Sequence, residues 1–130
     1  MLNYILIAVG SAVGGVARYW ISGLVANRFG QTFPWGTIIV NVTGCFVIGL
    51  FASLTGTEGR LLVPASLRTF FMIGICGGYT TFSSFSLQTL NLANDGEWFY
   101  ALGNVLLSVL LCLLGVWLGF LLGNYFNQLK

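Results

Sequence analysis

The chain has 130 residues, of which 57% are hydrophobic and only 6% are charged, whereas an ordinary soluble domain has about 25% charged residues. Its net charge of +2 comes from five basic residues scattered along the chain without a polybasic stripe, so we expect no nucleic-acid partner. This composition predicts an all-α membrane protein that forms a single transmembrane domain, residues 1–130, with room for about four spans.

Four hydrophobic stretches, separated by polar loops, predict these spans in chain order. The first is interpreted as a retained helix and not a signal peptide, because it has no basic leader and no small-residue cleavage site. Pro34 and Pro64 mark the beginnings of the second and third spans, since the fixed φ of proline suits a helix start. The approximate bounds of the four spans are 4–25, 35–53, 64–92 and 98–125.

The third span carries an internal interruption. Glycines at 74, 77 and 78 precede the β-branched pair Thr80 and Thr81, which predicts a helix that is unwound over residues 77–80. Unwound backbone at membrane depth is tolerated only where it is buried in protein or lines a cavity. Its freed carbonyls can coordinate a hard cation such as sodium. A simple glycine kink is the alternative.

Basic residues and small residues bear on how the spans assemble. Arg60, Arg68 and Lys130 fall on the side of the two termini, and Arg18 and Arg28 on the other, so orientation is weakly specified and insertion both ways up is expected. Glycines recur every fourth position, which lets helices pack closely, either within one chain or between copies. Four helices enclose no water-filled path of their own, so any transport role suggests a partner chain.

The predicted interior is polar but free of acids. The chain has no histidine and its three acidic residues lie in loops, so proton coupling and general acid–base catalysis lack their usual groups and no enzyme is expected. Neutral hydroxyl and amide groups, with the ring edges of Phe82 and Phe85, can hold a small dehydrated anion. Alternatively, the hydroxyls bond to their own helices and the rings contact lipid. Arg18, inside a span, either lines a positive vestibule or snorkels to the interface.

Three motifs resemble those of one membrane family. Residues 74–86, GICGGYTTFSSFS, closely resemble the third-helix signature of the Fluc (CrcB) fluoride channels. Residues 14–19, GGVARY, are similar to its first-helix motif, and Gly36, Thr37, Asn41, Gly44 and Gly49 to its second-helix motif. The resemblance implies a passive fluoride-selective channel that exports cytoplasmic fluoride across the bacterial inner (plasma) membrane. It also implies an antiparallel, dual-topology homodimer with two pores and a central structural sodium ion.

The resemblance also implies roles for individual residues. Backbone carbonyls of Gly77 and Thr80 would bind the sodium ion, and Arg18 would stand at the vestibule. Asn104 and Cys112 depart from the family, where tyrosine and serine can occur. The implied fluoride pathway consists of Asn41, Phe82, Phe85, Ser83, Ser84 and Ser108.

A small four-helix, dual-topology multidrug/proton exporter is the rival interpretation. Such exporters carry a membrane-embedded glutamate in the first span, and residues 4–25 contain none.

Overall fold

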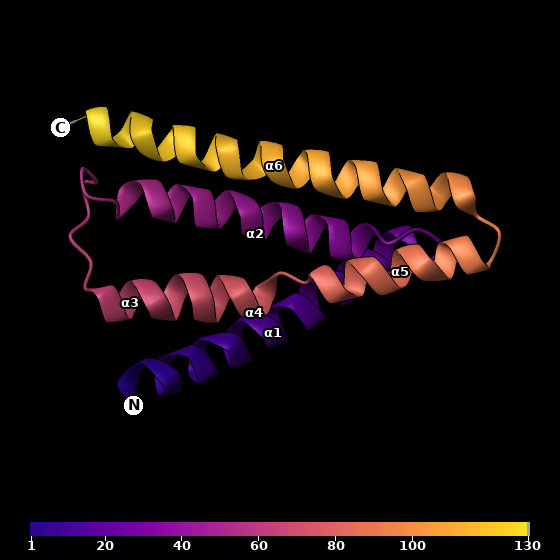
Figure 1. Cartoon of the computed structure of the whole chain (residues 1–130), viewed down its shortest axis with the longest axis horizontal. Coiled ribbons are helices and arrows are strands. Elements are labelled where there is room, and N and C mark those ends of the chain that lie inside the picture. Colours follow the sequence, from indigo (N-terminus) through magenta and orange to yellow (C-terminus); the bar gives the residue numbers. More distant parts are fainter. Residues whose placement is uncertain (130) are drawn as a thin grey trace.

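The computed structural model describes residues 1–129, all of whose regular elements are helices (Figure 1). Four helical spans are long and apolar enough to cross a membrane, as the sequence predicts, and they make this a multi-pass membrane protein. The third span, Ala65–Asn94, is assembled from four shorter helices. The elements are α1 (Leu2–Phe29), α2 (Trp35–Leu54), α3 (Ala65–Thr69), the π-helix η1 (Phe70–Cys76), α4 (Gly77–Tyr79), α5 (Phe82–Asn94) and α6 (Trp98–Gln128).

The beginning of α1, the end of α6 and the α2–α3 loop lie at one end of the bundle, on the left in Figure 1. The loop is fastened to α6 there, because the Arg60 backbone N–H donates to Asn127 Oδ1 at 3.0 Å and Arg60 Nη1 donates to the Phe126 carbonyl at 3.1 Å. This confirms the side expected for the N-terminus and the middle loop. Lys130, expected on the same side, lies outside the described residues.

Helices α2 and α6 run in the same direction and pack backbone against backbone (Figure 1). A Cβ atom on Gly119 would lie 3.0 Å from the Leu50 amide nitrogen, and one on Gly115 would lie 3.0 Å from the Val42 carbonyl oxygen. Both distances are closer than a side chain tolerates without a shift of its neighbours. The stripe of small residues on α6 therefore serves packing within the chain.

Helix α1 packs in a similar way against the third span. A Cβ atom on Gly10 would lie 2.8 Å from the Phe70 carbonyl oxygen, and one on Gly78 would lie 2.7 Å from Ser11 Cα. Gly10 and Gly74 face each other directly, since a Cβ atom on Gly74 would lie 3.0 Å from Gly10 Cα. Of the two uses expected for these glycines, the structure confirms the one within a single chain.

The third span is broken at Thr80 and Thr81, which lie inside the predicted interruption but after its glycines. Gly77 keeps helical angles of φ −65° and ψ −37°, so the expected unwinding over 77–80 is wrong for its first three residues. Extended backbone is confined to Thr80 (φ −78°, ψ 157°) and Thr81 (φ −151°, ψ 109°). The β-branched threonines suit extended backbone, whereas Gly74 and Gly78 serve close packing against α1.

Candidate functional site

Asn41 and Thr81 clamp the break to the middle of α2. Asn41 Nδ2 donates to the Thr81 carbonyl at 3.0 Å, and the Thr81 N–H donates to Asn41 Oδ1 at 2.7 Å. The Asn41 side chain is buried, with 9% of its surface exposed. Both backbone polar groups of Thr81, which the break removes from helical pairing, are therefore satisfied by one amide.

Thr81 also caps the helix that follows the break. Its Oγ1 accepts the N–H of Ser84 at 3.2 Å, which is the bond expected of a threonine at a helix N-terminus. The same oxygen donates to Ser84 Oγ at 3.0 Å and lies 3.3 Å from Ser83 Oγ. Three hydroxyl groups are thus gathered at the start of α5, beside the Asn41 amide.

A chamber of about 410 Å³ lies between α2, α6 and the broken third span. Its walls are mainly apolar, and no charged residue lines it within the part of the chain that the structure describes. The chamber is also lined by Thr81, Met72 and the three cysteines, none of which was predicted as a site residue. Six of the predicted site residues line it: Asn41, Gly77, Thr80, Phe82, Phe85 and Ser108.

Phe82 and Phe85 form one aromatic pair in the chamber wall, as their spacing predicts. Their ring centroids are 5.2 Å apart and the ring planes are inclined by 50°. Their environments differ, because Phe85 is 8% exposed and Phe82 is 76% exposed. Phe85 is therefore packed inside this chain, whereas most of the Phe82 ring lies on its surface.

A second, larger cavity of about 1370 Å³ contains Arg18, Ser84 and one acidic residue, Asp95, among its lining residues. Thr81 lines both cavities, so the break stands at their junction. The structure thus places the predicted residues in two groups, with Arg18 and Ser84 on one side of Thr81 and the aromatic pair on the other. Ser83 lines neither cavity, although it contacts the Thr81 hydroxyl.

Comparison of the chain with known proteins shows its family. The family described as "CrcB-like protein, Camphor Resistance (CrcB)" matches residues 5–120. The chain belongs to the CrcB family. It is 57% identical over 129 residues to the "Fluoride-specific ion channel FluC" of Methylocella silvestris, with 99% of this chain and 98% of that protein covered. Proteins of the same name from Rhodospirillum rubrum, 58% identical with 91% and 92% covered, and Opitutus terrae, 58% identical with 100% and 98% covered, are similar to it as well.

Membership of the CrcB family confirms the resemblance drawn from the three sequence motifs. The relatives are named as ion channels and not as enzymes, which agrees with the acid-free interior. Membership of this family also favours the channel interpretation over the multidrug/proton exporter.

One feature of this CrcB chain is a buried hydrogen-bonded row that ties α5 to α6. Ser108 Oγ donates to Asn104 Oδ1 at 3.2 Å, and Asn104 Nδ2 donates to Thr89 Oγ1 at 2.9 Å. Thr89 Oγ1 in turn donates to the Phe85 carbonyl at 2.7 Å. Asn104 is 1% exposed, so its amide is satisfied inside the protein and joins Ser108 to the backbone of Phe85.

Proposed function

We propose that this chain is a passive, fluoride-selective channel. The observation that carries the proposal is the chamber at the break, which offers amide, hydroxyl and aromatic-edge groups without any carboxylate. An anion entering it would meet hydrogen-bond donors and positive ring edges, and no negative charge in a low dielectric. The names of the relatives support fluoride as the permeant ion.

The proposed pathway runs from the Arg18 cavity past Thr81 into the chamber. Arg18 attracts anions to its own part of the larger cavity, because a guanidinium is always charged. The same cavity is also lined by Asp95, at the end of α5. The hydroxyls of Ser83 and Ser84 then contact the ion beside the break. Within the chamber, the ion passes Asn41, Phe82, Phe85 and Ser108.

The channel is proposed to be an antiparallel homodimer with two pores. Phe82 supports a partner, because a pore residue that is 76% exposed in one chain needs further protein to complete the wall around it. The even split of basic residues supports two opposite orientations. The proposed location is the bacterial inner (plasma) membrane, where the channel would export fluoride from the cytoplasm.

A structural sodium ion is proposed at the dimer centre, held by the carbonyls of Gly77 and Thr80. In a continuous helix these carbonyls would accept the N–H groups of Thr81 and Ser84. Those two N–H groups instead donate to Asn41 Oδ1 and Thr81 Oγ1, so both carbonyls lose their helical donors. Oxygen ligands suit a hard cation, and the absence of carboxylates favours a monovalent one.

Fluoride efflux from liposomes that contain the purified protein tests the proposed function. We expect rapid efflux, followed with a fluoride-selective electrode, when a potassium ionophore supplies the counter-current, and no comparable efflux of chloride. Protein-free liposomes provide the control. Absence of fluoride efflux, or efflux that requires a proton gradient or a drug substrate, would contradict a passive fluoride channel.

A further inference from the structure

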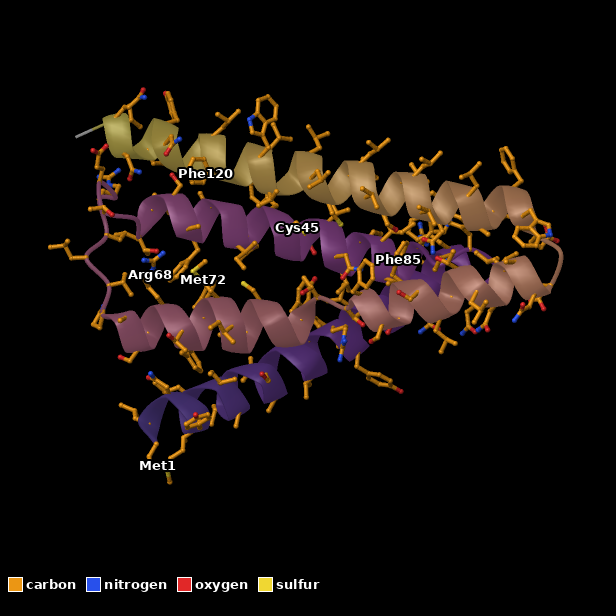
Figure 2. All side chains as sticks on the ribbon, viewed as in Figure 1. Met1, Cys45, Arg68, Met72, Phe85 and Phe120 are labelled. Carbon is orange, nitrogen blue, oxygen red and sulfur yellow. The ribbon has the colours of Figure 1, made fainter. Side chains whose placement is uncertain are left out.

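Arg68 is a partly buried cation that lies outside the proposed pathway. It lies in the last turn of α3, at the end of the third span that is distant from the break. Its Nε is inaccessible to solvent and has no hydrogen-bond partner among residues 1–129. Its Nη2 lies 4.0 Å from Met72 Sδ, and Figure 2 shows both side chains on the face of the third span that is turned towards α2.

This arrangement is costly for a guanidinium. The group stays charged at any physiological pH and has five N–H donors to satisfy. A thioether is a weak acceptor, and a buried donor that has no partner is destabilising. The three acidic residues of the chain lie outside its spans, and within residues 1–129 none of them is hydrogen-bonded to Arg68. A membrane-embedded arginine with so little compensation is expected to mark an ion pathway.

Arg68 stands next to the chamber at the end away from the break. Met72, one helical turn nearer the break, lines the chamber wall. The opposite end of the chamber is at Thr81, which also borders the cavity that contains Arg18. Two arginines therefore flank an uncharged chamber, one beyond each end.

We propose that Arg68 is the anion-attracting residue at the second mouth of the chamber, reached past Met72. This inference rests on the proposed function, since it assigns a role in the same pathway. A positive charge just outside each end lowers the energy of an anion at both mouths. The uncharged interior binds it weakly enough for release, which is the balance that conduction requires.

The test compares two neutral substitutions with one that keeps the charge. Arg68→Gln removes the charge, Arg68→Met also keeps the length of the apolar stem, and Arg68→Lys keeps a cation. Arg60→Gln is the matched control, because Arg60 is an exposed cation at the same end of the bundle and lines neither cavity. Efflux from liposomes is measured over a range of fluoride concentrations and divided by the amount of folded protein.

We expect each neutral variant to raise the half-saturating fluoride concentration roughly tenfold, by loss of local anion concentration. Arg68→Lys should recover most of this change, and Arg60→Gln should match the wild type. A merely structural role would lower the yield of folded protein and leave the half-saturating concentration unchanged, and that result overturns the inference. It is also overturned if Arg68→Lys is as impaired as Arg68→Gln. An inactive wild type overturns the proposed function, and this inference with it.

Discussion

Asn41 and Thr81 are 40 residues apart in the chain, yet a reciprocal pair of hydrogen bonds joins them. Asn41 Nδ2 donates to the Thr81 carbonyl at 3.0 Å, and the Thr81 N–H donates to Asn41 Oδ1 at 2.7 Å. One side chain thereby fixes the broken backbone and also lines the chamber. Changes at Asn41 should consequently alter the shape of the break as well as the polarity of the wall.

Asn41→Asp should abolish fluoride efflux and lower stability. The carboxylate retains an acceptor for the Thr81 N–H but loses the donor to the Thr81 carbonyl, which costs about 1–3 kcal/mol. It also places a negative charge beside the anion path. Efflux and thermal unfolding of the purified protein measure the two effects. Asn3→Asp, at an exposed position in the first turn of α1, is the control. Wild-type behaviour of Asn41→Asp at neutral pH would contradict both roles.

Phe82→Ile and Phe85→Ile should both reduce fluoride efflux, since each removes a polarised ring edge while keeping an apolar side chain. The two variants should differ in thermal stability. Phe85 is buried in this chain, so its replacement should cost up to about 1.5 kcal/mol. Phe82 is 76% exposed, so its replacement should cost less, mainly the contact with the Phe85 ring. Phe99→Ile, at another exposed ring, controls for general effects. Unchanged efflux in both variants would remove the aromatic pair from the pathway.

Gly119→Ala should separate α2 from α6. Its new methyl group would lie 3.0 Å from the Leu50 amide nitrogen, and overpacking of this kind costs about 1–3 kcal/mol. Gly103→Ala, in the same helix, is a matched control, because its methyl group would meet only one ring carbon of Phe33, at 4.0 Å. It should be neutral or gain up to about 1 kcal/mol of helix propensity. Equal melting temperatures for the two variants would show that the close approach is not tight.

The antiparallel dimer predicts complementation between oppositely biased chains. Thr57→Lys with Glu58→Lys adds positive charge to the exposed α2–α3 loop, and Asn94→Lys with Glu97→Lys adds it at the other end. Each double variant alone should insert one way and conduct little, because antiparallel partners become scarce. Coexpression should restore fluoride efflux. Full activity of one double variant, with its single orientation confirmed by cysteine labelling, would rule out an obligatory antiparallel pair.

Complete replacement of sodium by a large organic cation should slow fluoride efflux or dissociate the dimer, because the Gly77 and Thr80 carbonyls would lose their shared ligand. No sodium current should appear under any condition, since the proposed ion lies between the two pores. Efflux and the oligomeric state in detergent are measured with and without sodium on both sides of the membrane. If both are indifferent to sodium, the carbonyls have another partner.

Hydropathy and loop composition were enough to predict the four spans and their order, because the bilayer fixes both helix length and the satisfaction of backbone groups. The position of the break was less accessible. The glycines around it suggested unwinding at Gly77, but Gly74 and Gly78 are small in order to admit α1, a tertiary cause that no local pattern reveals. The π-helix Phe70–Cys76 was not predicted either.

At the site, residue type and helical spacing predicted the Phe82 and Phe85 pair, and polarity singled out Asn41. The hydrogen-bond partner of Asn41 could not be predicted, because its two bonds join α2 to Thr81, a residue with extended backbone in another span. Arg68 was counted only as a charge that affects orientation. Its unsatisfied Nε and its contact with Met72 depend on which face of the third span is turned inwards, and that is decided by packing.

The tight α2–α6 pair also has a bearing on biosynthesis. Gly49 of α2 is covered by the backbone of Val116, and α6 leaves the ribosome only after the whole third span. During translation α2 must therefore remain in the bilayer, its small-residue face open to lipid or to other nascent helices, until α6 arrives. This tight pair therefore forms only after the third span has been made, and a product terminated before Gly115 would have no means of covering that face.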